Sequence, residues 1–218
     1  MYMNKKSHLA LETPPLYVCT TRFNENTWSQ NNHFREKNNI STGCIYNSPY
    51  SLSIKIPEDM LIFVIEMNNS LNEIMGIGLI RNKPIEKHYK IYECDNYHRF
   101  QYASQFHIDR KCLPENITEH FDKVLFKGKG HLKRGNGITK IPFKYLLSER
   151  ERIRVEKKCE EIYTVTPETT TIKHLKNLQR KMYRKREKRL QNTEIVQELQ
   201  RLFIDLFPDV KKYLQLNI

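Results

Sequence analysis

The sequence predicts an α+β protein in which a small, curved β-sheet or barrel has flanking helices and is followed by a basic helical extension. Two observations support this fold class. Apolar and β-branched runs with strand spacing dominate the first two thirds of the chain, and from Ser148 onward apolar residues recur at helical spacing among many charges. We therefore expect an N-terminal tail over residues 1–14, an α+β domain over 15–147 and a basic helical region over 148–218.

The first elements follow from local composition. A strand is expected at residues 16–21, which are rich in β-branched and aromatic side chains and follow two prolines. A short polar helix should come next and continue to about Asn38, capped by the side chain of Asn24 or Asn26. Strict alternation of polar and apolar residues over 51–56 then predicts a half-buried strand.

Two apolar runs, residues 60–67 and 74–80, form the clearest pattern in the chain. An Asn-rich turn separates them, which is typical of a β-hairpin that crosses the core. Gly76 and Gly78 occupy alternate positions of the second run and so share one face. Their missing side chains would permit close approach of a backbone or a flat ligand, or simply tight packing within a curved strand.

The remainder of the domain continues the mixed pattern. Further strands are expected at residues 89–92, 100–102 and 106–110. A helix over 117–126 should then lead through a basic, glycine-rich segment to a short strand at 138–141, which a proline ends.

Composition limits the class of protein. The 218 residues include 37 Lys and Arg against 25 Asp and Glu, a formal charge of +12. No run approaches the roughly 20 apolar residues of a membrane span, and the start lacks the apolar block of a signal peptide. Single, scattered cysteines indicate reduced thiols, an intracellular location in the cytoplasm or nucleus, and neither a metal site nor a cofactor. They are Cys19, Cys44, Cys94, Cys112 and Cys159.

The segment 127–137 is a candidate phosphate-binding loop. It contains four of the seven glycines and no acidic residue. Exposed backbone amides together with Lys129, Lys133 and Arg134 could contact a nucleic-acid backbone, whereas the spacing of a nucleotide-hydrolysing P-loop is absent. The alternative is a mobile, solvated loop.

The most basic part of the chain is residues 171–190, with nine basic residues, one acid and a net charge of +8. An apolar stripe at helical spacing accompanies these charges. We expect a helix that binds nucleic-acid phosphates. The alternatives are a solvated helix face, a patch like a nuclear-localisation signal, or a helix docked on an acidic protein partner. The proposed backbone-binding residues are Arg180, Lys181, Arg184, Lys185, Arg186, Lys188 and Arg189.

Aromatic residues near expected loops could stack on a base. Trp28 and Tyr97 are the preferred candidates because their Asn and His neighbours could hydrogen-bond to base edges. Catalysis has weaker support: His107 and Asp109 could serve a metal-dependent nuclease, but no nuclease motif accompanies them, and no catalytic residue is assigned.

The order of these elements resembles the PUA-like superfamily, in particular its EVE and YTH branches. The likeness rests mainly on residues 59–80, where an apolar strand precedes a turn and a second apolar strand with alternate glycines, and it extends loosely over 16–141. Where the family usually has glycine before its aspartate, this chain has Glu58.

The resemblance implies a small, curved β-barrel that binds RNA, or DNA with modified bases, and in some members an aromatic pocket that holds a methylated base. By position after the first strand it also implies that Trp28 and Asn31 belong to a base-binding pocket. Tyr97 joins this predicted pocket because of its ring and its polar neighbours rather than through the resemblance. The Asn- and Lys-rich composition is similar to that of proteins from large DNA viruses, which would place the protein in a host cell or a virion.

The leading hypothesis is therefore a non-enzymatic protein that binds RNA or DNA and no membrane. A barrel would read a base or a shape, and the basic helix would hold the phosphate backbone. The main alternative is a structural or scaffold protein, for example of a virion, whose basic helix docks on an acidic partner.

Overall fold

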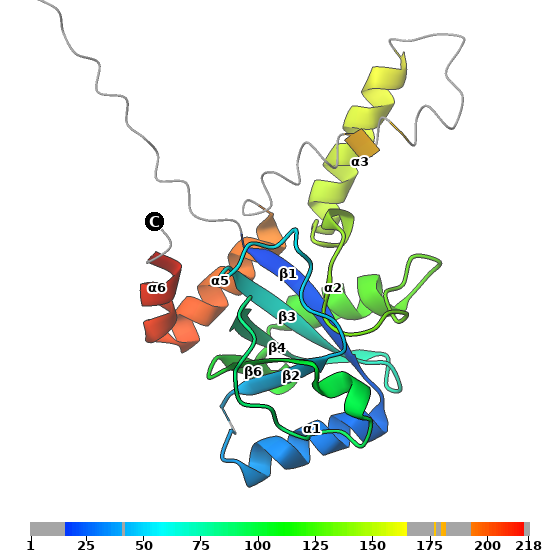
Figure 1. Ribbon diagram of the computed structural model, residues 1–218. Coiled ribbons are helices and arrows are strands. Elements are labelled where there is room, and N and C mark those ends of the chain that lie inside the picture. The colour runs from blue at the N-terminus through cyan, green and yellow to red at the C-terminus, as the bar shows by residue number, and fades with distance from the viewer. Residues whose placement is uncertain (1–15, 41, 165–176, 178–179, 182–192, 216–218) are drawn as a thin grey trace, which may run out of the picture.

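The computed structural model is an α+β fold built on a mixed five-stranded sheet with the order β6-β4-β3-β1-β7 (Figure 1). The structure describes residues 16–40, 42–164, 177, 180–181 and 193–215. A separate antiparallel pair, β2 and β5, lies against one face of this sheet.

The elements have the following bounds. The strands are β1 (Tyr17–Phe23), β2 (Cys44–Ser48), β3 (Leu61–Asn68), β4 (Glu73–Arg81), β5 (Phe100–Ser104), β6 (His107–Asp109) and β7 (Thr139–Lys140). The α-helices are α1 (Glu25–Lys37), α2 (Glu115–Phe126), α3 (Glu149–Thr164), α5 (Glu194–Leu206) and α6 (Pro208–Gln215). Short 3₁₀ helices are η1 (Asp95–His98), η2 (Arg110–Cys112) and η3 (Phe143–Tyr145).

The central strand is β3, and its pairing confirms the expected hairpin. It runs antiparallel to β4, with Val64 opposite Gly78, and parallel to β1, with Val18 opposite Phe63. All eight of its residues are buried, because both faces of the sheet are covered.

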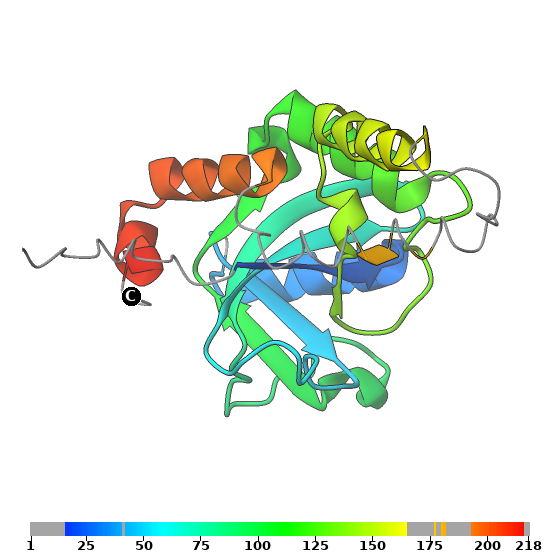
Figure 2. The same cartoon turned by 90° about the horizontal axis from the view of Figure 1, so that it is seen from above.

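Alternation along β3 separates two apolar clusters. Phe63, Ile65 and Met67 point to one face, whereas Ile62 and Val64 point to the other. Helices α2, α3 and α5 cover the first face (Figure 2). The second face is covered by α1 and the β2-β5 pair.

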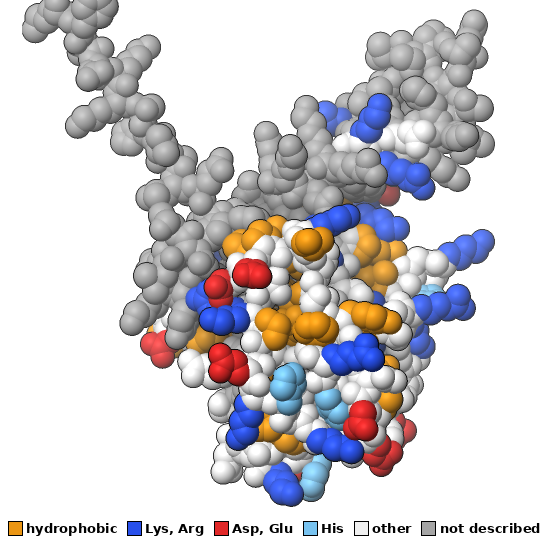
Figure 3. Space-filling model, in the orientation of Figure 1, with side chains coloured by type: hydrophobic (Ala, Val, Ile, Leu, Met, Phe, Trp, Pro, Cys, Tyr) orange, Lys and Arg blue, Asp and Glu red, His pale blue; other side chains and the backbone are white. Residues whose placement is uncertain are grey.

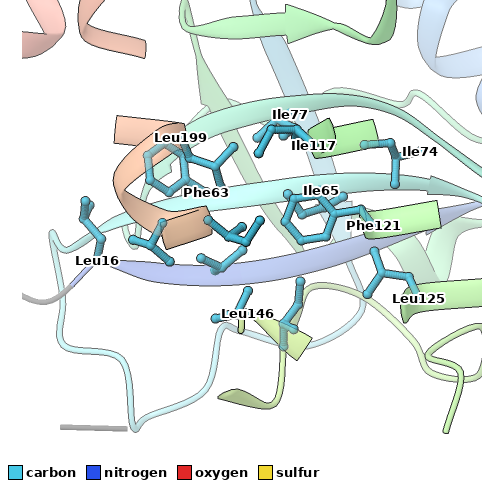
Figure 4. Close-up of a cluster of buried hydrophobic side chains, with 14 of the residues drawn as sticks. Leu16, Phe63, Ile65, Ile74, Ile77, Ile117, Phe121, Leu125, Leu146 and Leu199 are labelled. Atoms are coloured by element: carbon cyan, nitrogen blue, oxygen red, sulfur yellow. The ribbon is translucent and has the colours of Figure 1, made fainter. Parts of the chain in front are cut away.

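Helix α5 packs into the first cluster because its apolar residues form one stripe. Its N-cap Thr193 accepts a hydrogen bond from the backbone of Val196. Leu199 lies beside Phe63 in the cluster (Figure 4), and the ring of Phe203 is centred 5.1 Å from that of Phe63. Residues on both sides of the expected boundary at Ser148 therefore share one core.

Helix α1 begins as the sequence predicts. The Asn24 side chain accepts from the backbone N–H of Thr27 at 2.8 Å, and the Thr27 hydroxyl accepts from the backbone N–H of Asn24 at 3.0 Å. This reciprocal capping box fixes the direction in which the chain leaves β1.

Two expected strands are absent from the described residues. Residues 51–56 form a turn in which the backbone N–H of Ile56 donates to the Ser53 carbonyl. Ile54 is 99% exposed, so the alternating polar and apolar residues do not form the half-buried strand that the sequence predicts. Residues 89–92 join no ladder, and the Gln101 side chain bonds to both backbone groups of Tyr89.

The sheet is open rather than closed into a barrel within the described part of the chain. Its edges are β6 and β7, which are three and two residues long and too short to close the sheet. The α+β class is thus confirmed. The expectation of a closed barrel is wrong for the described residues.

The basic region is described only in part. Arg180 and Lys181 are helical and exposed. The expected tail at 1–14 lies outside the described residues, as do the basic residues Arg184, Lys185, Arg186, Lys188 and Arg189.

Candidate ligand-binding pocket

A pocket of about 190 Å³ opens where β1 ends and α1 begins. Distant segments complete its walls: Asn47 from β2, Asn69 from the turn after β3, Tyr92 and Tyr97 from the segment around η1, and Gly135 and Gly137 from the loop after α2. Its volume is below the roughly 300–1,000 Å³ of sites for drug-sized ligands, so it suits a single small ring system.

The amide of Asn47 is the most informative group in this pocket. The residue is 5% exposed, yet neither its Oδ1 nor its Nδ2 has a hydrogen-bond partner among the described residues. Its cross-strand neighbour Gln101 is also buried, but that amide accepts from the backbone N–H of Tyr89 at 2.7 Å and donates to the Tyr89 carbonyl at 2.5 Å. An unsatisfied buried polar group costs about 1–3 kcal/mol, and Asn47 lines the pocket, so its buried amide is the candidate group for a polar contact with a ligand.

Asn69 adds a second acceptor. Its Nδ2 donates to the Lys133 carbonyl at 2.9 Å, whereas its buried Oδ1 has no partner within the described segments.

Arg22 supplies positive charge. Its Nε donates to the Leu132 carbonyl at 2.5 Å and its Nη1 to the Thr139 hydroxyl at 2.9 Å, and no carboxylate of the described residues pairs with it. Burial lowers the pKa of this guanidinium, which nevertheless stays protonated because its ordinary pKa is so high. An uncompensated cation favours an anionic or electron-rich ligand.

The glycines of the loop after α2 form one wall. Gly135 has φ +143° and places its backbone over Arg22, where an added Cβ would lie 3.3 Å from the guanidinium carbon. Gly137 has φ +67°, and an added Cβ would overlap the Ser48 hydroxyl. Only glycine fits both positions without strain, and the two glycines thus let the loop lie against the pocket.

The loop also carries basic side chains: Lys133 and Arg134 directly precede the lining residue Gly135, whereas Lys129 lies between Gly128 and Gly130, which line another pocket. Lys133 donates to Asn72 at 2.5 Å, and Lys129 and Arg134 are exposed. Figure 3 shows Lys and Arg side chains gathered at the right-hand edge of this face, where the loop projects.

Of the expected base-binding residues, the structure brings Tyr97 to the pocket and places the other two behind its wall. Trp28 packs edge-on against Phe23, which lines the pocket, with ring centroids 5.2 Å apart. Asn31 donates to the hydroxyl of Tyr92, another lining residue, at 3.0 Å. Both therefore contact lining residues rather than the pocket itself.

A buried polar cluster lies between the sheets, away from this pocket. Glu66 accepts hydrogen bonds from Tyr46 at 2.8 Å and from His107 at 3.0 Å, and Arg35 lies 4.0 Å away. Burial acts to raise the pKa of Glu66, but these contacts outweigh it and hold that pKa below its ordinary value. A Cβ added at position 76 would collide with His107 and Glu66, so Gly76 makes room for these side chains rather than for a ligand.

The same geometry bears on the nuclease alternative. Nη2 of Arg35 lies 3.0 Å from Nδ1 of His107, and Nε2 of the same ring lies 3.0 Å from the Glu66 carboxylate. The His107 side chain is 5% exposed and engaged on both nitrogens, whereas Asp109 is exposed and caps η2. The part of the chain that the structure describes contains no group of three or more potential metal ligands.

Comparison of the chain with models of protein families, with curated proteins and with solved structures finds no match. In the described residues, no helix is long and apolar enough to cross a bilayer.

Sequence reasoning missed several residues that line the pocket. Arg22 and Tyr92 gave no local signal, because a single Arg or Tyr at a strand end is common. Asn47 did give one: asparagine is disfavoured in strands, yet it stands within an otherwise strand-like run.

Proposed function

We propose that this protein is a non-enzymatic, single-stranded nucleic-acid-binding protein that takes one base into the pocket between β1, β2 and the glycine loop. The unsatisfied amide of Asn47 carries this proposal. A side-chain amide matches the paired donor and acceptor on the edge of a base. A base can enter a closed pocket only when it is unpaired, which favours single strands.

Charge around the pocket supports a nucleotide over a neutral ring. Arg22 is a cation without a carboxylate partner among the described residues, and Lys129 and Arg134 extend the positive surface outward. The +12 charge of the chain would add sequence-independent attraction to phosphates. The expected basic helix belongs to the same proposal as a second phosphate contact.

A PUA-like architecture is part of this proposal. It is supported by the helix that follows the first strand and by the apolar hairpin with alternate glycines. The base preference, including any preference for a modified base, would then depend on the walls formed by Tyr92, Tyr97 and Phe23.

The test compares Asn47→Ala with Gln101→Ala, two amide truncations on paired strands. Binding of fluorescently labelled single- and double-stranded RNA and DNA is measured by anisotropy over a salt series. Asn47→Ala should weaken binding of single strands about 5- to 150-fold, the value of one bidentate base contact, without lowering the free energy of unfolding. Gln101→Ala should lower that free energy because it orphans the Tyr89 backbone groups.

Two results would overturn the proposal. One is loss of stability in Asn47→Ala equal to that in Gln101→Ala, because Asn47 would then be a structural amide. The other is no nucleic-acid binding at low salt, which would favour the scaffold alternative, in which the basic region docks on an acidic protein.

A further inference from the structure

A second pocket, of about 310 Å³, adjoins the first at Tyr97, which lines both. The same chain segments build the two pockets. Asn47 in β2 lines the first pocket, and Tyr50, just after β2, lines the second. In the loop after α2, Gly135 and Gly137 line the first pocket, and Asn136 between them lines the second. The pockets are thus neighbours that share Tyr97 as a lining residue.

Tyr50 has the properties of a stacking platform for this second pocket. Its side chain is 63% exposed, which is unusual for a large aromatic residue. Its backbone is held in place, because the Ser48 hydroxyl donates to its carbonyl at 2.6 Å and accepts from its N–H at 3.3 Å. An exposed ring on a held backbone can stack on a planar ligand.

The polar groups of the second pocket suit a nucleotide. Arg99 is exposed, and Asn96 and Asn136 add amide donors and acceptors. Among the residues that line it in the described chain there is no Asp or Glu. A cation, two amides and an aromatic ring together match a phosphate, a base edge and a base face.

We propose that the second pocket binds the nucleotide adjacent to the base held in the first, so that the protein engages two consecutive nucleotides with Tyr97 between them and Tyr50 stacked on the second base. This proposal rests on the proposed function of the first pocket. It adds that the minimal high-affinity ligand is a dinucleotide rather than a single nucleotide.

The experiment titrates the full-length protein with the four nucleoside 5′-monophosphates and with dinucleotides, in ribose and deoxyribose forms, by isothermal titration calorimetry. The best dinucleotide should bind roughly 5- to 150-fold more tightly than the best mononucleotide, the value of one stacked base. Tyr50→Ala should abolish this gain while leaving mononucleotide affinity unchanged. Tyr50→Phe, which keeps the ring, should retain the gain.

The native thiols provide an independent readout. Cys94 is exposed and lines the second pocket, whereas Cys112 is exposed on η2 outside both pockets. A saturating dinucleotide should slow alkylation of Cys94 by iodoacetamide several-fold and leave Cys112 unaffected, as measured by mass spectrometry. A saturating mononucleotide should protect neither.

The outcomes separate the two proposals. Mononucleotide binding that depends on Asn47, with no gain from a dinucleotide and no protection of Cys94, overturns the second pocket but leaves the first. A dinucleotide gain that Tyr50→Ala does not reduce also overturns the proposed stacking. Absence of binding by every nucleotide and dinucleotide overturns both.

Discussion

At the scale of single residues, Glu66 organises the polar interior between the two sheets. The side chain is fully buried, and Tyr46, His107 and Arg35 surround its carboxylate. A charge in such a place is tolerated only because hydrogen bonds and an opposite charge compensate its lost hydration. Removing one member should therefore cost more than a surface ion pair is worth.

Glu66→Gln should lower the free energy of unfolding by about 3–5 kcal/mol at pH 7, because Arg35 is left buried without its counter-charge. Urea unfolding measures this change. The matched control is Glu73→Gln, whose carboxylate is 47% exposed and lies 3.8 Å from Arg110, and which should change stability by less than about 1 kcal/mol. Equal effects of the two substitutions would contradict the role of Glu66.

The same carboxylate predicts a pH dependence. Because the folded state holds the pKa of Glu66 below the ordinary 4.5, its contribution is fully present above pH 4.5 and is lost as pH falls through the folded value. Wild-type stability should thus decline in acid more steeply than that of Glu66→Gln. Parallel pH profiles of the two proteins would refute this linkage.

At the scale of elements, η1 carries Tyr97 and is held by His98. The Nε2 atom of His98 accepts from the backbone N–H groups of Ile91 and Tyr92 at 3.2 and 3.1 Å. Its ring also stacks parallel to that of Tyr92, which lines the first pocket. The positions of Tyr92 and Tyr97, which line the pocket, therefore depend on an unprotonated Nε2 of His98.

Acid should weaken the pocket through His98. Burial lowers the pKa of His98 below the ordinary 6.5, so its stabilising contacts are present above pH 6.5 and are lost as pH falls toward the folded value. Affinity for a single-stranded oligonucleotide should drop over this range, before Glu66 titrates. His98→Gln, whose side-chain oxygen can still accept, should show a flatter profile; an unchanged profile would exclude His98 as the cause.

The loop after α2 carries both the glycines that line the first pocket and the exposed basic residues Lys129 and Arg134. Lys129→Glu combined with Arg134→Glu should weaken binding of all sequences alike and reduce the slope of log affinity against log salt by roughly one per lost phosphate contact. Lys55→Glu, an exposed lysine that lines neither pocket, serves as the control. A change in base preference with an unchanged salt slope would contradict a phosphate role for the loop.

At the scale of the whole molecule, one apolar cluster unites the sheet with α2, α3 and α5. Because Val155, Leu199 and Phe203 are buried against sheet residues, deletion of residues 148–218 would expose the core rather than detach an independent arm. The role of the basic region is better tested by point changes. Reversal of Arg184, Lys185 and Arg186 should weaken binding uniformly and flatten its salt dependence.

Phe203→Ala should lower the free energy of unfolding by about 3–5 kcal/mol, because it leaves a cavity against Phe63 in the shared cluster. Leu206→Ala, one turn further along α5 and 49% exposed, should cost far less. Differential scanning fluorimetry compares the two. A small effect of Phe203→Ala would mean that α5 is dispensable for the sheet.

Local pattern predicted much of the fold. The hairpin of β3 and β4, the Asn24 cap and helix α2 follow from periodicity and turn chemistry, which act over neighbouring residues. Residues 51–56 were misjudged because alternation says nothing about whether a partner strand is within reach. The pocket was predicted only in part: Tyr97 lines it, Trp28 and Asn31 stand behind it, and Asn47 was overlooked.

The sequence by itself determined the α+β fold class, because strand and helix periods and capping residues are properties of local order. Only the tertiary structure decided that the sheet stays open, that α5 shares its core, and that Asn47, Arg22 and the glycine loop meet at one pocket. The physical reason is that burial without a hydrogen-bond partner, the property that marks Asn47, arises from contacts among segments far apart in the chain.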